Sequence, residues 1–212
     1  MIRQGSIIRL RPEYEERYII LHKHTFPGVL SRIRQSNIRN YSIFLLDGIL
    51  FSYFEYSGND FDSDMKAIAD ETTKEWWKLT DPMQEPLPSR KQGEWWASMA
   101  ELSVIENVGH ASNAKRYAWT AEVRSGSENS IYEHYRTLGM QCAPYFKKFK
   151  IQNQAVYFIS GNLYMYEEYC GDSFLKDRQK LLDIPEVKKW NEELGKNLKT
   201  SWRDMREVFH TE

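Results

Sequence analysis

The chain has 212 residues and a formal net charge of -1, from 29 basic and 30 acidic side chains. This length allows one large domain or two domains of about a hundred residues each. Hydrophobic residues make up 41% and charged residues 28%, which is typical of a globular protein and not of a disordered one. Because no long run of Lys or Arg occurs, nucleic acid is not expected as the main partner.

The termini and cysteines bear on the compartment. Met1–Ser6 leads directly into a strand-like pattern with no apolar core behind its basic residue, so we expect no signal peptide. No apolar run approaches the length of a membrane span, so no membrane association is expected. Cys142 and Cys170 could pair only with each other, and free thiols in a reducing cytoplasm are the expected state.

The first half of the chain predicts the order β-α-β-β-α-β. Pro12 suits the first position of a helix, and Asp47-Gly48 is a strong signal for a two-residue hairpin turn. The predicted elements are a strand at 7–10, a helix from 12 to about 35, strands at 40–46 and 49–56, a helix in two pieces at 61–80 and a strand at 98–105. This order is the ferredoxin-like arrangement, an antiparallel sheet with helices on one face.

The first helix carries a candidate pair of titratable residues. Tyr18 and His22 are four residues apart, a spacing that places both side chains on one helix face. A proton-transfer site needs such a pair, although the same spacing is ordinary on an amphipathic helix surface. Pro27 follows within a pattern that still indicates helix, so we expect a kink just past the pair.

The same order of elements returns in the second half. It predicts a strand at 117–123, a helix from 130 to about 149, a hairpin at 155–159 and 163–169, helical segments at 174–198 and a strand at 204–210. Several residues recur at equal spacing: Tyr18 and Pro27 with Tyr135 and Pro144, Gly48 and Glu55 with Gly161 and Glu168, and Trp96, Met99 and Glu101 with Trp202, Met205 and Glu207. We predict an internal duplication, with units at 1–106 and 115–212 and a polar linker at 107–114.

A duplicated unit of this kind has a simple packing solution. Each sheet would have one face without helices, and burying these faces against each other makes a two-sheet core or barrel. We therefore predict an α+β fold of two tandem ferredoxin-like (βαββαβ) units, packed within one chain as a pseudo-dimer that resembles a dimeric α+β barrel. The sequence leaves open whether the chain is a monomeric pseudo-dimer or a homodimer.

Three segments of the first half together resemble the L-rhamnose mutarotases. They are the helix with Tyr18 and His22 followed by Pro27, the strand opening Asn40-Tyr41, and Trp76-Trp77-Lys78, within a likeness from Met1 to about Ile105. The family's unit is a ferredoxin-like α+β domain that dimerises. It interconverts the α and β anomers of L-rhamnose without a cofactor. The resemblance therefore implies a cofactor-free isomerase acting on L-rhamnose or a related deoxysugar.

The resemblance also implies roles for particular residues. The family's proton-donating histidine falls on His22, its sugar-contacting tyrosines on Tyr18 and Tyr41, and its sugar-contacting tryptophans on Trp76 and Trp77. Histidine suits this chemistry because its ordinary pKa, about 6.5, lets it give or take a proton near neutral pH. Adjacent tryptophans on a helix are also explained by one residue in the core and one at a surface edge.

The second half departs from the family pattern. By the spacing of the repeat, Gly139 stands at the position of His22, Ala155 or a neighbour at that of Tyr41, and Trp190 alone at that of the tryptophan pair. We therefore expect a degenerate unit that completes the core and could line one wall of the remaining site. One active site per chain is expected.

Other candidate sites and functions are weaker. His22 and His24 form a His-x-His pattern, but residues two apart on a helix point in different directions, so no metal site is expected. Trp95-Trp96 resembles a second sugar platform, but its recurrence as Trp202 favours a structural role. The alternatives to a mutarotase are a non-catalytic sugar-binding or regulatory module and an oxidoreductase of the dimeric α+β barrel type.

Overall fold

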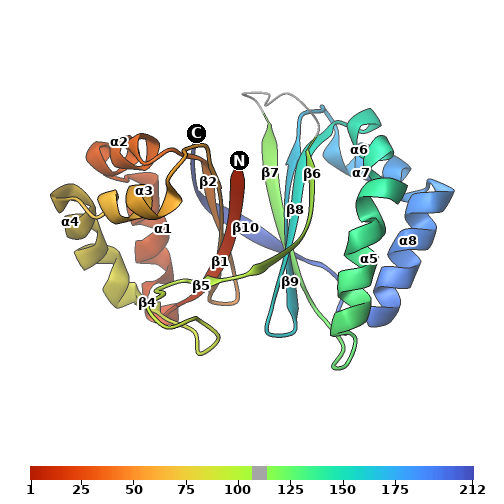
Figure 1. Ribbon diagram of the computed structural model, residues 1–212, viewed down its shortest axis with the longest axis horizontal. Coiled ribbons are helices and arrows are strands. Elements are labelled where there is room, and N and C mark those ends of the chain that lie inside the picture. The colour runs from red at the N-terminus through yellow and green to blue at the C-terminus, as the bar shows by residue number, and fades with distance from the viewer. Residues whose placement is uncertain (107–113) are drawn as a thin grey trace. The chain divides into compact units, whose positions relative to one another are not determined.

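The computed structural model describes residues 1–106 and 114–212, and of residues 138–141 the backbone alone. The described residues divide into unit 1, Met1–Met99 with Arg206–Glu212, and unit 2, Ala100–Met205. In each unit the helices cover one face of an antiparallel set of strands (Figure 1). The ferredoxin-like α+β class predicted from the order of elements is confirmed.

Unit 1 contains the elements from β1 to β5 and the end of the chain. Its strand order is β4–β1–β3–β2–β10, with β5 also paired to β1. Its elements are β1 (Ile2–Leu10), η1 (Pro12–Tyr14), α1 (Glu15–Lys23), α2 (Pro27–Gln35), β2 (Ile38–Leu46), β3 (Ile49–Tyr56), α3 (Phe61–Ala67), α4 (Glu71–Thr80), η2 (Asp81–Met83), β4 (Gln84–Glu85), β5 (Ala97–Ser98) and the later part of β10 (Arg203–Thr211).

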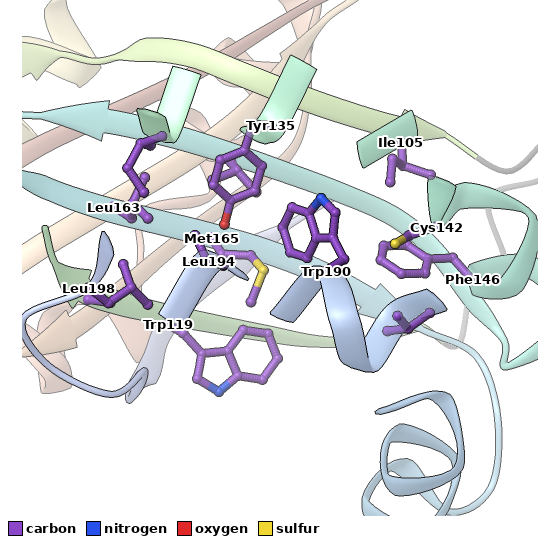
Figure 2. Packing of buried hydrophobic residues seen from close by; sticks show 14 of the residues in the cluster. Ile105, Trp119, Tyr135, Cys142, Phe146, Leu163, Met165, Trp190, Leu194 and Leu198 are labelled. Carbon is purple, nitrogen blue, oxygen red and sulfur yellow. The ribbon is translucent and has the colours of Figure 1, made fainter. Parts of the chain in front are cut away.

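Unit 2 repeats this plan with the rest of the chain. Its strand order is β7–β9–β8–β6, and the first residues of β10 pair with β7. Its elements are β6 (Ala100–Glu106), β7 (Lys115–Glu122), α5 (Glu128–Gln141), α6 (Ala143–Lys148), β8 (Ile151–Ile159), β9 (Asn162–Tyr169), α7 (Phe174–Leu182) and α8 (Pro185–Asn197). Figure 2 shows its buried side chains packed between the helices and the strands. No helix among the described residues is long and apolar enough to span a membrane.

The prediction of one kinked helix from 12 to about 35 is wrong, because α1 and α2 are separate helices. α1 ends at Lys23, and Pro27 occupies the first position of α2, where its missing N–H removes no helical hydrogen bond. Phe26 has extended backbone (φ -55°, ψ 129°), the conformation that a following proline favours. His22 therefore lies in the last turn of a short helix, and the Thr25 hydroxyl donates a hydrogen bond (3.0 Å) to its carbonyl oxygen.

Both predicted hairpin turns are confirmed. Asp47 and Gly48 have φ values of 49° and 72°, and Ser160 and Gly161 have values of 49° and 78°. Two consecutive residues with positive φ define the type I′ turn, whose twist matches that of the strands it joins. The turns set the register of the β2–β3 and β8–β9 pairs.

The compact units differ from the predicted halves because the closing strands are exchanged. The strand predicted at 98–105 divides at Met99: β5 pairs with β1, whereas β6 pairs with β8 in unit 2. Most of β10 pairs with β2 in unit 1. A strand edge presents unpaired N–H and C=O groups, and the exchanged strands satisfy those of β2 and β8. The linker predicted at 107–114 lies outside the described residues, apart from Ala114.

The repeat is visible in matched hydrogen bonds 113 positions apart. The Tyr53 hydroxyl donates to Glu55 Oε1 at 2.8 Å, and the Tyr166 hydroxyl donates to Glu168 Oε1 at 2.8 Å. Glu55 and Glu168 are 2% and 4% exposed, so they are buried structural carboxylates and not charges at a sheet edge. Cys142, the buried cysteine, and Cys170 are both free thiols, as predicted.

Candidate functional site

The His22 side chain, in the last turn of α1, is positioned by a hydrogen bond within its own helix and by three aromatic rings of unit 1. Its side chain is buried, with its ring centroid 3.9 Å from that of Tyr18, 5.2 Å from Trp76 and 5.6 Å from Phe209. The Tyr18 ring faces the imidazole at a tilt of 30°, while the other two rings meet it edge-on. These contacts fix the plane of the imidazole, as a proton-transfer group requires.

The hydrogen bond of the imidazole determines which nitrogen is basic. Nδ1 of His22 lies 2.9 Å from the carbonyl oxygen of Tyr18. A carbonyl oxygen only accepts hydrogen bonds, so Nδ1 carries the proton and Nε2 keeps its lone pair in the neutral ring. The i, i+4 spacing recognised in the sequence thus has two effects: it stacks the rings and selects the tautomer.

The environment keeps His22 neutral. Burial lowers the pKa of His22 from 6.5 to about 4, and the hydrogen bond to the Tyr18 carbonyl offsets part of that shift. Removing an imidazolium from water costs more than removing the neutral ring, which is the cause of the shift. At neutral pH the group is therefore an unprotonated base at Nε2.

Tyr18 is held by a chain of side-chain contacts. The Trp95 indole N–H donates to Gln84 Oε1 at 2.9 Å, and Gln84 Nε2 donates to the Tyr18 hydroxyl oxygen at 3.4 Å. With this donor on its oxygen, the hydroxyl keeps its own hydrogen for another acceptor. Burial, followed by the proximity of Tyr41, raises the pKa of Tyr18 well above 10.0. Tyr18 is therefore a neutral hydrogen-bond donor.

Tyr41 reaches the site because β2 contains a bulge. The register with β3 shifts between Arg39 and Ser42, and Asn40 has a φ of 49°. An extra residue reverses the alternation of side chains, so Tyr41 joins Ile38 on the helix-covered face. Burial raises the pKa of Tyr41 to about 12, so its hydroxyl is also a neutral donor.

These side chains line one cavity of about 390 Å³, which we call the unit 1 cavity. All five residues singled out in the sequence lie on it: Tyr18, His22, Tyr41, Trp76 and Trp77. Trp76 is buried, and Trp77 is partly exposed. A second cavity, of about 230 Å³, continues past His22 and Trp76 toward Phe209. The volume of the first is in the range of small-molecule sites.

Several residues on the two cavities were not assigned to the site from the sequence. Gln84, Trp95 and Trp96 line the unit 1 cavity, so a purely structural role for the tryptophans is not what their position indicates. Asp81 provides the carboxyl group among the lining residues, and burial raises its pKa. The second tryptophan pair was visible in the sequence. Phe209, at the far end of the chain, carried no local signal at all.

His24 lies outside the candidate site. His24 is exposed on the other side of the helix end and does not line either cavity of unit 1. Among residues 1–106 and 114–212, no group of three or more His, Cys, Asp or Glu side chains is arranged to hold a metal ion. His24 is useful as a matched control for His22.

The pKa of His22 predicts a pH-dependent stability. Its folded value is about 4 against 6.5 in the unfolded chain, so the unfolded state binds the proton more readily between those values. The contribution of His22 to the free energy of unfolding is therefore complete above pH 6.5. As the pH falls toward 4, this free energy decreases by roughly 3 kcal/mol. Urea unfolding of wild type and His22→Gln across this range checks the prediction. The difference between the two curves should change with pH, and parallel curves would contradict it; His24→Gln should track wild type.

In unit 2 the corresponding helix presents different side chains. His134, one residue before Tyr135, stacks on Trp190 with ring centroids 4.0 Å apart. Gly139, the sequence counterpart of His22, lies in the stretch where only backbone is described. The imidazole of His134 thus packs against a tryptophan, whereas the imidazole of His22 packs against a tyrosine.

Sequence comparisons concern the first half of the chain. The family model for L-rhamnose mutarotase matches residues 3–103. The chain is 30% identical over 88 residues to L-rhamnose mutarotase of Lactiplantibacillus plantarum, covering 40% of this chain and 82% of that protein. It is 28% identical over 91 residues to L-rhamnose mutarotase of Mannheimia succiniciproducens, covering 42% of this chain and 83% of that protein.

Structural comparisons cover the whole chain. A candidate monooxygenase of Lactobacillus acidophilus NCFM matches with a TM-score of 0.62 at 9% identity, over 100% of this chain and 96% of that one. A candidate monooxygenase of Fusobacterium nucleatum matches with a TM-score of 0.61 at 8% identity, over 98% and 92%. At such low identity these likenesses show a shared fold and do not transfer a reaction.

Proposed function

The chain belongs to the L-rhamnose mutarotase family, and from that premise we propose that unit 1 interconverts the α and β anomers of a deoxysugar. The substrate class is L-rhamnose or a closely related sugar, and the reaction needs no cofactor. His22 is the proposed acid/base group, with Tyr18, Tyr41, Trp76 and Trp77 holding the sugar.

One observation carries the proposal. His22 is buried and neutral, its Nδ1–H is committed to the Tyr18 carbonyl, and Nε2 is left as a base on a cavity lined by two tyrosines. A histidine that served only packing would not need a fixed tautomer with its free nitrogen beside neutral donors. General acid–base catalysis requires this combination of positioned groups.

The proposed reaction moves one proton between the two oxygens on C1. Nε2 of His22 takes the proton of the anomeric hydroxyl, and that O–H electron pair forms the C1=O1 double bond. The C1–O5 bond breaks, its electron pair moves to the ring oxygen, and the imidazolium Nε2–H gives the proton to this oxygen while the neutral Tyr18 hydroxyl donates a hydrogen bond to it. Rotation about C1–C2 presents the other face of the aldehyde. Nε2 then takes the O5 proton as O5 attacks C1 and returns it to O1, which restores His22.

The aromatic lining supports a sugar with an apolar side. Trp76 and Trp77 offer flat apolar surface to the C–H groups and the methyl group of a deoxysugar, while the Tyr41 hydroxyl donates to a sugar oxygen. The raised pKa of Tyr41, about 12, supports its role as a donor that stays neutral. Such a site binds a neutral substrate without burying an unpaired charge.

Saturation-transfer NMR of anomer exchange tests the proposal on wild-type protein. L-Rhamnose and L-fucose are compared with L-mannose and L-galactose, which differ from them only by a hydroxyl on C6. Acceleration is expected for a deoxysugar, about tenfold or more above its hydroxylated partner, since an apolar pocket discriminates a hydroxyl only modestly. If exchange of no sugar in the panel is accelerated, the proposal is wrong.

The alternatives differ in what supports them. A non-catalytic sugar-binding module would bind the same sugars without changing their exchange rate, so the NMR experiment separates it from an enzyme. The oxidoreductase alternative rests on fold likeness alone, and a fold of this kind hosts many unrelated functions.

A further inference from the structure

Unit 2 contains a cavity of about 610 Å³ that is not part of the proposed active site. It lies between the strands β7, β8 and β9 and the helices α5, α7 and α8, and all of its lining residues belong to unit 2. The residues that matter for its chemistry are Trp119, Tyr135, Gln154, Glu167, Arg178 and Trp190. We call it the unit 2 cavity.

The repeat shows that this cavity is the counterpart of the unit 1 cavity. Tyr135 matches Tyr18 by its spacing from the helix proline, and its ring centroid lies 5.3 Å from that of Trp190, the single tryptophan of α8. The offset of 113 that aligns the hairpins places Gln154 at the position of Tyr41. The second half thus keeps a cavity at the matching place in its fold, with a different lining.

An ion pair between a buried carboxylate and a partly exposed guanidinium forms one wall of the unit 2 cavity. Glu167 is 0% exposed, and its carboxylate accepts hydrogen bonds from Gln154 Nε2 at 2.7 Å and from Arg178 Nη1 at 3.0 and 3.2 Å. The Arg178 guanidinium also lies over the Trp119 ring, 4.5 Å from its centroid. The planar charged groups are therefore held rigidly, at the edge of an aromatic surface.

Stability alone does not account for this ion pair. The same offset places Phe54 and Met65 of unit 1 at the positions of Glu167 and Arg178, and this apolar pair lines the smaller cavity near His22. An apolar pair of similar size is commonly as stable as a buried ion pair, or more so, because the charges lose their hydration. The chain itself shows that the fold accepts the apolar pair, so the charges indicate a ligand.

Polar groups remain available on the cavity wall. Only Nη1 of Arg178 donates to a side chain, and within the described part of the chain Nε and Nη2 have no acceptor. Trp190 Nε1, on another lining residue, is buried and has no hydrogen-bond partner among the described residues. The Tyr135 hydroxyl also lies on this lining, on a side chain that is 3% exposed. Figure 2 shows this hydroxyl pointing away from α5, toward Met165 and Leu194 in the cavity lining. A buried polar group without a partner is costly unless a ligand or water satisfies it.

Each charged residue on the lining is paired with an opposite charge. Glu167 and Arg178 neutralise each other, and Lys199, the other charged lining residue, pairs with Glu122 at 2.6 Å. Burial raises the pKa of the Cys142 thiol to about 11, so it too is uncharged. A charged ligand would find no unpaired counter-charge, whereas a neutral ligand with several hydroxyls would find donors, acceptors and flat aromatic faces.

We propose that unit 2 binds a neutral sugar in the unit 2 cavity, between the Glu167–Arg178 pair and the aromatic rings of Trp119, Tyr135 and Trp190. The sugar is held and not converted, because the repeat places no histidine at the position of His22. Binding here does not depend on the reaction proposed for unit 1.

The test follows indole ¹⁵N–¹H resonances of the full-length protein during titration with L-rhamnose, L-fucose and D-galactose. D-Galacturonate and D-galactosamine serve as charged probes of similar shape. The indoles of Trp119 and Trp190 report the unit 2 cavity, and those of Trp76 and Trp95 report unit 1. The decisive variant, Glu167→Phe/Arg178→Met, installs the apolar pair of unit 1 at the matching positions.

At least one neutral sugar should shift the Trp119 and Trp190 resonances of wild type and of His22→Ala. In Glu167→Phe/Arg178→Met its affinity should fall at least tenfold, since charge-assisted hydrogen bonds are lost. That variant should melt no lower than wild type and keep its anomer-exchange rate, and Tyr135→Phe should weaken binding without unfolding.

Two results overturn the proposal. One is the absence of any sugar-induced shift at Trp119 and Trp190 in wild type, and the other is a shift by a charged probe alone. Either result leaves the anomer-exchange rate untouched, so failure of this proposal is distinguishable from failure of the function proposed for unit 1.

Discussion

Replacing His22 by alanine is expected to lower the catalysed rate of anomer exchange by about 10²–10⁴-fold, the usual contribution of one positioned acid or base. The physical reason is the loss of Nε2, the unprotonated nitrogen on the unit 1 cavity. Saturation-transfer NMR on L-rhamnose or the best sugar of the panel measures the rate. Added imidazole should restore part of it, because it can enter the space left by the side chain.

His24→Ala is the matched control, since His24 is exposed at the end of the same helix. It should keep the wild-type rate. The pH profile gives a second check: with the pKa of His22 at about 4, the base stays unprotonated as the pH falls through 6.5, and the rate should decline only as 4 is approached. Full activity of His22→Ala, or a decline centred at 6.5, would remove His22 from the mechanism.

The second large effect is expected from Phe209→Ala at the far end of the chain. The Phe209 side chain is 7% exposed in unit 1, with ring centroids 5.6 Å from His22 and 5.5 Å from Tyr41. Removing a buried phenyl ring costs about 3–5 kcal/mol of unfolding free energy through lost burial and the cavity left behind. Urea unfolding measures this cost, and the exchange rate should also fall because two site residues lose a packing partner.

Two further variants serve as controls for Phe209→Ala. Phe209→Leu keeps most of the volume and should cost about 1–2 kcal/mol, with a smaller loss of rate. Leu175→Ala removes an apolar side chain that is 81% exposed in unit 2, and it should change the stability by no more than about 0.5 kcal/mol. If Phe209→Ala were as mild as Leu175→Ala, β10 would not support the site as its packing indicates.

Local chemistry made a large part of the fold predictable. The type I′ turns at Asp47-Gly48 and Gly161 follow from residues that tolerate positive φ, and the strands beside them from short runs rich in β-branched and aromatic residues. The helix carrying Tyr18 and His22 was also found, together with its face. The kinked helix predicted at Pro27 was wrong because a proline inside a helix and a proline that begins a new helix have similar neighbours in the sequence.

The candidate site was predictable where its residues are close in sequence or belong to a family motif. The five side chains named from the sequence do lie on one cavity. Gln84 and Phe209 carried no signal in the sequence, because their positions depend on long-range contacts and not on periodicity. The sequence predicts a degenerate unit 2 because the absence of a histidine is visible there, whereas the contact between the Glu167 and Arg178 side chains appears only in the folded chain.

The amino-acid sequence by itself determined the order of the elements, the duplication, the family and the spacing that stacks Tyr18 on His22. These depend on interactions between residues near one another along the chain. Only the tertiary structure decided three things. The bulge at Asn40 turns Tyr41 toward the helices, the exchanged strand β10 brings Phe209 against His22, and burial moves the pKa of His22 to about 4. Each depends on which distant atoms exclude water from a side chain, and that is set by packing in three dimensions.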